Sequence, residues 1–529
     1  MVDRAKHLLG RANAGQTVAS ATLIISGAYL LSRILGLLRN RLLAAHFGLG
    51  PDLSAYNAAF RLPDLLFTLL VSGAFAVAFI PVLSRHLEQK QQDEAWRVTS
   101  SLLNLLVLIT IAGGVVIVVF ADPLMRIMAP GFDAHTHELA TGLTRILAIT
   151  PVLFAVSSVL GSVQQAFNRF LIYSFSGVLY NVGIIVGIIA FVPHLGVYGA
   201  AWGVVLGVIT QALLQWLGLH GLGFKYRPVI SLRLAGVRQT LGLMLPRSID
   251  QGLDQINYTV ETVIGSTISA SAIAQFAYAN DLKNVPLVLI GSSITTAVFP
   301  RLAARAAEGQ REQLIEAYVK TARLILFLAI PSALFAVVAR GYIVRLLYGF
   351  GDLDTATTLG WFAGTIVFTS LFMLVSRVYY AMQNTRTPLY LSLASIPLNI
   401  ALSIWLGRVY GVAGLAMSAS IVAVLETLAL VALLRHGYGR FGEKSIMHGV
   451  WRMVVAAAIM LGALYPLIAQ IMPLYADDRG FLTLMPKFAL IVAVALLTYL
   501  VPCYALRLNE ARHFATRAKE LLARSLSLT

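Results

Sequence analysis

Tyr173–Val192 reads YSFSGVLYNVGIIVGIIAFV, twenty residues without a charged side chain. A helix of this length crosses a hydrocarbon core about 30 Å thick. Similar runs recur along the chain and predict an all-α polytopic membrane protein with fourteen transmembrane helices. The predicted spans are Thr17–Leu38, Ala55–Leu83, Leu102–Ala121, Leu139–Phe167, Tyr173–Val192, Val197–Leu219, Leu234–Gly265, Ala270–Phe299, Ala322–Val338, Thr355–Met382, Leu389–Trp405, Val412–Leu434, Met447–Met472 and Leu482–Ala505.

The composition supports a lipid environment and argues against an enzyme. Of 529 residues, 58% are hydrophobic and 12% are charged, whereas soluble domains average about 45–50% and 25%. The single cysteine, Cys503, excludes an intramolecular disulfide. The sequence contains no phosphate-binding Walker loop, dinucleotide fingerprint or metal-ligand cluster. We therefore expect no cofactor, no metal and no ATP hydrolysis by the chain itself. Met1–Gln16 is polar and basic, so we expect no cleavable signal peptide.

The net charge of +16 follows the predicted topology. If the N-terminus is cytoplasmic, 26 of the 40 Lys and Arg residues lie on the cytoplasmic side, 8 lie on the opposite side, and the remaining six lie within apolar runs. Cytoplasmic loops of membrane proteins are enriched in Lys and Arg. The distribution predicts that both termini are cytoplasmic, and nucleic-acid binding is not needed to explain the charge.

An internal repeat divides the chain. YNAAFRLP (Tyr56–Pro63) is matched by ANDLKNVP (Ala279–Pro286), and the glycines of LGVYG (Leu195–Gly199) are matched by Gly411 and Gly414. An even number of helices in each repeat gives both halves the same orientation. The repeat predicts two six-helix lobes related by an axis along the membrane normal, with the substrate path between them. The predicted parts are an N-lobe (1–222), a C-lobe (223–440), and helices 13 and 14 with a basic tail (441–529).

The seventh span carries a polar stripe within PRSIDQGLDQINYTVE. Five of its polar side chains fall within about 80° of one another at helical spacing. Charges inside a bilayer are costly and face a cavity or a partner. The stripe is interpreted as the lining of a cavity, and the alternative is an interhelical salt-bridge network. Its members are Arg247, Asp250, Asp254, Asn257 and Glu261.

Further intramembrane charges lie in spans 1, 2 and 8. Arg33 lies in the middle of the first span, and an arginine in a cavity suits phosphate because its planar fork forms bidentate hydrogen bonds. Near the end of that span, Arg39 and Arg41 either reach the interface or line the cavity. The second and eighth spans add Arg61 and Asp64, which are spaced as an i, i+3 pair, and Asp281 and Lys283, which point to different faces.

Several motifs resemble the MurJ/MviN family, the lipid II flippases of the multidrug/oligosaccharidyl-lipid/polysaccharide exporter superfamily. The motifs are SRILGLLRN (Ser32–Asn40), AFRLPDLL (Ala59–Leu66), SGAFAVAFIPVLSR (Ser72–Arg85), APGF (Ala129–Phe132) and the Pro246–Asn257 segment. The resemblance implies a central cationic cavity, a groove for a polyprenyl tail that reaches helices 13 and 14, and outward movement of lipid II by alternating access. It also implies a bacterial cytoplasmic membrane, and as partners lipid II, membrane lipids and other cell-wall synthesis proteins.

Arg33, Arg39 and Arg247 match charged positions of the family, and the resemblance implies that they bind the substrate. Arg61 and Lys283 are interpreted as further substrate-binding residues of a rearranged set. A charge network or ion coupling is assigned to Asp64, Asp250, Asp254, Glu261 and Asp281. The coupling would use the membrane potential or a monovalent cation. Asn40, Ser54, Phe67, Thr68, Ser72, Asp281 and Asn284 depart from the family's usual charges. Two alternatives therefore stay open, a flippase for another polyprenyl-linked glycan and a cation-coupled multidrug exporter. A non-transporting membrane scaffold explains the intramembrane charges poorly.

Overall fold

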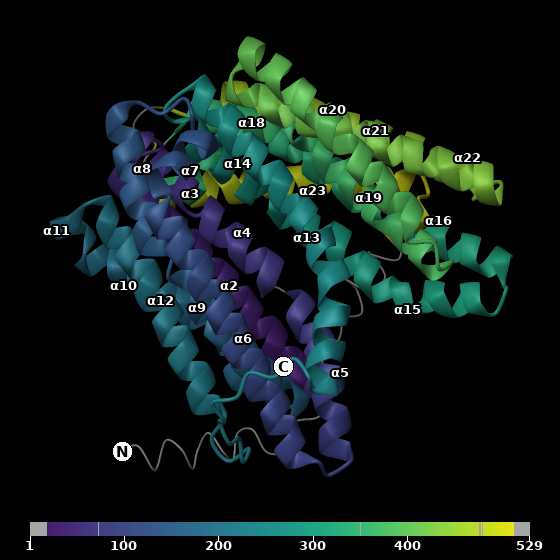
Figure 1. Cartoon of the computed structure of the whole chain (residues 1–529). Coiled ribbons are helices and arrows are strands. Elements are labelled where there is room, and N and C mark those ends of the chain that lie inside the picture. The colour runs from purple at the N-terminus through teal and green to yellow at the C-terminus, as the bar shows by residue number, and fades with distance from the viewer. Residues whose placement is uncertain (1–17, 72, 350, 476–477, 479, 513–529) are drawn as a thin grey trace, which may run out of the picture. The chain divides into compact units, whose positions relative to one another are not determined.

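The apolar runs form helices in a computed structural model of the chain, which describes residues 18–71, 73–349, 351–475, 478 and 480–512. The side chains of residues 18–23, 73–74, 245–247, 249–251 and 253–254 lie outside this description. The described residues contain no β-strand, which confirms the all-α class (Figure 1). Helices satisfy their backbone hydrogen bonds internally, as a bilayer requires.

Residue contacts divide the chain into two compact units, Met1–Ala274 and Gln275–Thr529. The first contains α2 (Val18–Phe47), α3 (Pro51–Ala59), α4 (Arg61–Leu70), α5 (Gly73–Glu88), α6 (Gln92–Val119), α7 (Ala121–Met128), α8 (Ala134–Leu147), α9 (Thr150–Ala166), α10 (Phe170–Ala190), α11 (Val192–Leu195), α12 (Val197–Gly218) and α13 (Ala235–Ile268). α13 packs on α4, α5, α6 and α7, so this helix belongs to the first unit. The division into lobes at residues 222 and 440, which follows the internal repeat, stays a prediction.

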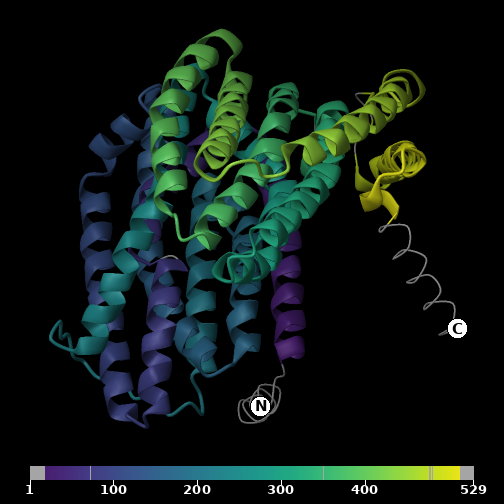
Figure 2. The ribbon, with the colours of Figure 1, turned by 90° about the vertical axis from the view of Figure 1, so that its right-hand side faces the viewer.

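The second unit begins within α14 and pairs its helices as hairpins. Its elements are α14 (Ala272–Pro286), the π-helix η1 (Leu287–Ser292), α15 (Ser293–Ala307), α16 (Arg311–Val338), α17 (Arg340–Tyr348), α18 (Leu353–Trp361), α19 (Ala363–Ala381), α20 (Arg386–Tyr410), α21 (Val412–Tyr438), α22 (Glu443–Pro466), the π-helix η2 (Leu467–Ile471) and α23 (Phe481–Ala505). Figures 1 and 2 show α20 and α21 side by side, and α22 and α23 pack on α16 and α17.

Twelve helical stretches of the described residues are long and apolar enough to cross a membrane. They coincide with twelve of the predicted spans. The other two predicted spans correspond to α2 and α13, of 30 and 34 residues. The multi-pass architecture is confirmed, and the number fourteen stays a prediction.

Five of the predicted spans are interrupted within the described residues. The fourth divides into α8 and α9, the tenth into α18 and α19, and the thirteenth into α22 and η2. The other two contain Pro63 and Pro286, where breaks are expected from the sequence. The second span breaks at Phe60 and Val71 into α3, α4 and α5. In the eighth span, the turn after Pro286 widens into η1, because proline cannot donate the hydrogen bond that a regular turn needs. Apolar periodicity alone does not reveal such breaks.

The glycines of the predicted repeat occupy equivalent positions in the two units. Gly196 and Gly411 precede α12 and α21 with φ of +56° and +62°, a conformation that suits glycine. Three residues later, a Cβ on Gly199 would lie 2.5 Å from the Phe191 carbonyl carbon, and one on Gly414 would lie 2.1 Å from the Leu406 oxygen. The repeat is therefore present in the backbone as well as in the sequence.

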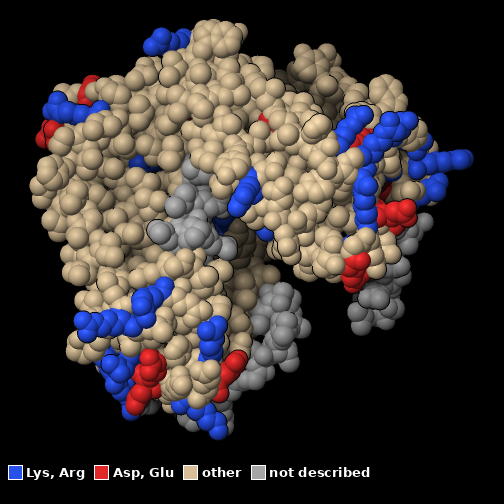
Figure 3. All heavy atoms as spheres, turned by 45° about the vertical axis from the view of Figure 1, so that its right-hand side comes forward, with Lys and Arg blue, Asp and Glu red and all other residues tan. Residues whose placement is uncertain are grey.

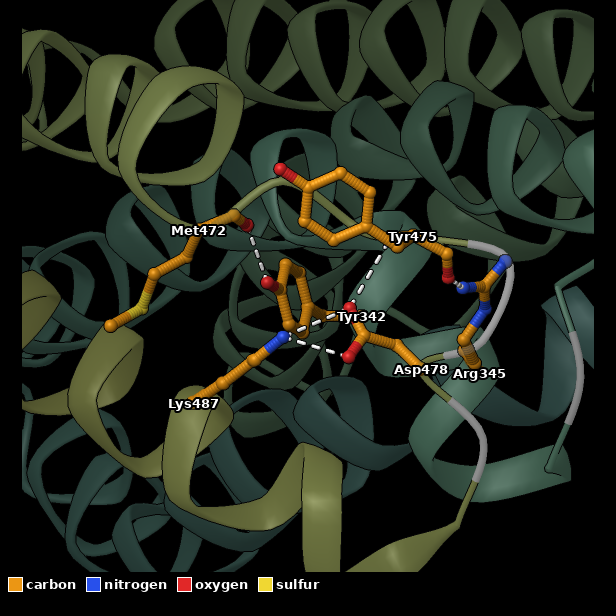
Figure 4. Close-up of polar contacts among 6 residues, drawn as sticks. All are labelled: Tyr342, Arg345, Met472, Tyr475, Asp478 and Lys487. Atoms are coloured by element: carbon orange, nitrogen blue, oxygen red, sulfur yellow. Dashed lines mark hydrogen bonds and ion pairs between the residues drawn. The ribbon is translucent and has the colours of Figure 1, made fainter.

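A cluster of polar contacts fastens the segment between η2 and α23 to α17 (Figure 4). Lys487 Nζ lies 2.8 and 2.9 Å from the Asp478 carboxylate oxygens, and the Tyr475 N–H donates to the same carboxylate at 3.1 Å. From α17, Tyr342 Oη donates to the Met472 carbonyl at 2.5 Å, and Arg345 donates to the Tyr475 carbonyl. These contacts hold the entry to α23 against the second unit.

Loss of the Asp478 charge is expected to loosen this cluster. The Lys487 ammonium, followed by the Tyr475 N–H, lowers the pKa of Asp478 below its ordinary 3.8. A lowered carboxyl pKa stabilises the fold above the ordinary value, and the contribution is lost as the pH falls through the lowered value. Asp478→Asn should reduce the melting temperature by about 1–2 °C at neutral pH, as expected for about 1 kcal/mol in a protein of this size. The difference from the wild type should vanish in strong acid.

Thermal unfolding of the purified protein across pH tests this prediction. The matched control is Glu316→Gln, which removes an acid that pairs with Lys320 while both side chains are more than 60% exposed. An equal shift in both variants, or a shift that does not depend on pH, would contradict the assigned role of Asp478.

Candidate functional site

Arg33 lies in the middle of α2 and is fixed by a tyrosine one turn earlier. Its Nε and Nη2 donate to Tyr29 Oη at 3.0 and 2.8 Å, and its Cζ lies 5.0 Å from the Tyr29 ring centroid. The side chain is exposed, and no described carboxylate pairs with it. A charge this deep in a span needs water, a ligand or a polar partner. The neutral phenol orients the guanidinium without cancelling its charge.

Arg39 is oriented in a similar way by Asn40. Its Nε and Nη2 donate to Asn40 Oδ1 at 3.0 and 2.9 Å, and Asn40 is 7% exposed. The Asn40 amide supplies these hydrogen bonds without a negative charge that would compensate the guanidinium. Arg39 also interacts electrostatically with the buried Tyr56 and the half-buried Tyr180. α2 continues to Phe47, beyond the predicted end at Leu38, so Arg39 and Arg41 lie within the helix.

Arg61 connects α4 to α13. Its Nε donates to Thr262 Oγ1 at 2.8 Å, and its Cζ lies 5.6 Å from the Tyr258 ring centroid. Asp64 interacts electrostatically with Arg61, but the close hydrogen bond goes to Thr262 rather than to the predicted i, i+3 partner. The reason is positional, because Arg61 is the first residue of α4 and helical side chains lean toward the N-terminus.

Only part of the polar stripe on α13 is described. The side chains of Arg247, Asp250 and Asp254 lie outside the described residues, so their predicted roles are untested. Glu261 is half-buried and has a polar partner. The buried Oδ1 of Asn257 has no hydrogen-bond partner among the described residues. Whether the stripe lines a cavity or forms a salt-bridge network therefore stays a prediction.

Asp281 and Lys283 belong to the second unit and differ in environment. Asp281 is exposed, whereas Lys283 is 9% exposed and its Nζ lies 4.4 Å from the Phe362 ring centroid. The aromatic face stabilises the ammonium through a cation–π interaction. The two side chains face different surroundings, as their spacing predicts, and their functional roles stay predictions.

Sequence reasoning did not identify the four residues that contact Arg33, Arg39 and Arg61. They are Tyr29, Asn40, Tyr258 and Thr262. A spacing signal was available for some of them. Tyr29 precedes Arg33 by four residues, and Tyr258 and Thr262 follow Asp254 by four and eight. Side chains at these spacings share one helix face.

The described residues contain no group of three or more His, Cys, Asp or Glu side chains that could hold a metal ion. Their chemistry is that of anion recognition, with fixed guanidinium groups at membrane depth. The fold is that of a multi-pass membrane protein, and the described part of its spans carries guanidinium groups oriented by neutral side chains.

The family model described as "Lipid II flippase MurJ" matches residues 43–485. The chain therefore belongs to the lipid II flippase MurJ family, which confirms the resemblance seen in its motifs and assigns it to transporters rather than enzymes.

Curated relatives support this assignment along most of the chain. A probable lipid II flippase MurJ of Rhizobium meliloti is 28% identical over 468 residues, covering 83% of this chain and 85% of the relative. One of Bdellovibrio bacteriovorus is 29% identical over 512 residues, covering 92% and 95%.

Solved structures show the same fold. A lipid II flippase MurJ in an inward closed conformation has a TM-score of 0.75 at 23% identity, covering 92% of this chain and 99% of that one. An inward-facing multidrug resistance MATE family transporter of the MOP superfamily has a TM-score of 0.65 at 17% identity, covering 77% and 94%. At these identities the likeness concerns the fold alone.

Proposed function

We propose that the chain moves lipid II, the undecaprenyl-pyrophosphate-linked peptidoglycan precursor, from the inner to the outer leaflet by alternating access. The family match over residues 43–485 supports a lipid II flippase. The carrying observation is that neutral acceptors, Tyr29 and Asn40, orient Arg33 and Arg39. Guanidinium groups held this way remain available to a pyrophosphate, with which they form charge-assisted bidentate hydrogen bonds.

The remaining charges fit the same proposal. Arg61, Arg247 and Lys283 would add positive charge along the path of the headgroup. Acids would hold these cations when the site is empty, or couple transport to a monovalent cation or the membrane potential. One elementary charge crossing 100 mV corresponds to about 2.3 kcal/mol. The acids assigned this role are Asp64, Asp250, Asp254, Glu261 and Asp281.

We place the chain in the bacterial cytoplasmic membrane with both termini in the cytoplasm. Described contacts within the first unit support the alternation of sides. Arg227 pairs with Asp93 at 2.6 Å, which joins the second-to-third and sixth-to-seventh connections. On the other side, Gly131 N–H donates to Ser266 Oγ at 3.2 Å. The excess of Lys and Arg identifies the first of these sides as cytoplasmic. Because the chain belongs to this family, we also propose other cell-wall synthesis proteins as partners.

Expression in cells depleted of their own lipid II flippase tests the proposed function. Survival and outer-leaflet lipid II should both be restored to within about twofold of the cells' own flippase. Rescue would show that Asn40 in place of an acid is compatible with lipid II transport. Failure despite normal membrane abundance would contradict lipid II as the substrate.

A second candidate function is transport of another polyprenyl-linked glycan. It is favoured by the positions, including Asn40 and Ser54, at which the chain departs from the usual charges of the related family. Ser54 is fully buried, and its Oγ accepts a hydrogen bond from the Ala274 N–H at 3.2 Å. The serine therefore serves a packing contact where the related family carries an acid. Outward movement of a different undecaprenyl-pyrophosphate glycan, without lipid II transport, would support this candidate.

A further inference from the structure

A pocket of about 680 Å³ lies at the ends of α15, α16, α19 and α21 in the second unit. Its lining contains none of the intramembrane arginines of the first unit. Figure 3 shows Lys and Arg side chains gathered on this end of the second unit, with fewer acids beside them. The lining residues that matter here are Arg305, Arg311, Leu314, Met382, Tyr438 and Phe441.

Of the two pocket arginines, Arg311 is held by a neutral acceptor, whereas Arg305 contacts a neutral amide and an acid. Arg305 Nη1 donates to Gln310 Oε1 and lies 3.4 Å from the exposed Glu308 carboxylate. Arg311 Nη2 donates to the Tyr438 carbonyl. Each guanidinium carries five N–H donors, so these contacts use only part of their capacity.

Local backbone geometry keeps Arg311 in this position. Gly439 has a φ of +79°, and a Cβ there would lie 2.8 Å from Arg311 Nη2. Glycine at this position lets the guanidinium approach the backbone closely. Arg311 also opens α16, whose 28 residues place the positive end of a helix dipole at the pocket.

We propose that this pocket binds a phosphate group, supplied by an anionic phospholipid of the cytoplasmic leaflet. Two oriented guanidinium groups and a helix N-terminus match a phosphodiester. Leu314, Met382 and Phe441 supply apolar walls for the glycerol and the first acyl carbons. The charge distribution places this end of the helices at the anionic cytoplasmic surface, where such lipids concentrate. The inference does not depend on which glycan the transporter moves.

Native mass spectrometry of the full chain with phosphatidylglycerol or phosphatidylcholine tests the site. The wild type should retain phosphatidylglycerol preferentially, and Arg305→Gln/Arg311→Gln should weaken that retention by about tenfold or more. The matched control, Arg301→Gln/Lys320→Gln, removes two charges from the same two helices outside the pocket lining and should retain the preference. Equal retention by all three proteins would overturn the proposal.

A second measurement leaves both arginines intact. Cys503 is buried, so Met382→Cys provides one accessible thiol at the pocket. Phosphatidylglycerol should slow maleimide labelling of this thiol several-fold relative to phosphatidylcholine. Protection by inorganic phosphate alone would support the phosphate site and identify a free anion as its ligand. Labelling that neither anion slows would overturn the site, even if the double arginine variant fails to fold.

Discussion

Arg33→Ala is expected to abolish transport while the protein still reaches the membrane. Arg33 is exposed within a membrane span and is oriented by two hydrogen bonds to Tyr29. In the proposed complex, Arg33 pairs with the pyrophosphate of the substrate. Removing one partner of such a desolvated charge pair costs about 2–5 kcal/mol, so transport should fall by about 30-fold or more. The measurement is rescue of flippase-depleted cells over a series of expression levels, scored with outer-leaflet lipid II and with the amount of protein in the membrane.

Three companion variants separate substrate binding from packing. Arg33→Lys keeps the charge but loses the planar fork, so it should restore only part of the activity. Tyr29→Phe keeps the ring and removes the hydrogen-bond acceptor, so it should reduce transport by only a few-fold. Arg126→Ala removes an arginine that is 70% exposed and bonded to Asp122, and should have no effect. Full rescue by Arg33→Ala at native expression would refute its role in binding.

The positions of the spans could be predicted because membrane thickness fixes helix length and lipid requires apolar side chains. The end of α2 at Phe47 could not be predicted, because the charge of Arg39 indicated that the apolar span ends at Leu38. Within the folded chain, Asn40 satisfies Arg39 and the helix continues. Pro63 and Pro286 indicated breaks in their spans, but the positions Phe60 and Val71 could not be predicted, since tertiary contacts decide which turns of an apolar run open.

The candidate site was only partly accessible to sequence reasoning. Spacing along one helix places Tyr29 beside Arg33. The contact between Arg61 and Thr262 joins residues 201 positions apart, and it depends on how α4 and α13 are rotated about their own axes. One sequence does not contain that rotation. For the same reason, the packing of α13 within the first unit emerged only from the structure.

Gly187→Leu is expected to prevent stable folding of the first unit. α10 and α12 pack along their length, and glycines allow their backbones to meet. A Cβ on Gly187 would lie 2.1 Å from Gly203 Cα, and one on Gly183 would lie 2.3 Å from Gly207 Cα. No side-chain rotation relieves a clash with backbone. Without a hydrophobic drive between helices in lipid, this close packing and its dispersion contacts provide much of the association.

The expected cost is about 3 kcal/mol or more, at the upper end for overpacking, because one helix must move away from the other. Fluorescence-detected size exclusion and thermal unfolding should show aggregation or a large loss of melting temperature, with Gly187→Ala intermediate. The matched control is Gly462→Leu, at an exposed helical glycine of α22 where a Cβ would meet no other atom within 4 Å. This variant should be as stable as the wild type, because leucine there meets only lipid. Equal stability of the two leucine variants would mean that α10 and α12 tolerate separation. Close packing at the glycines would then not be required for the stability of the first unit.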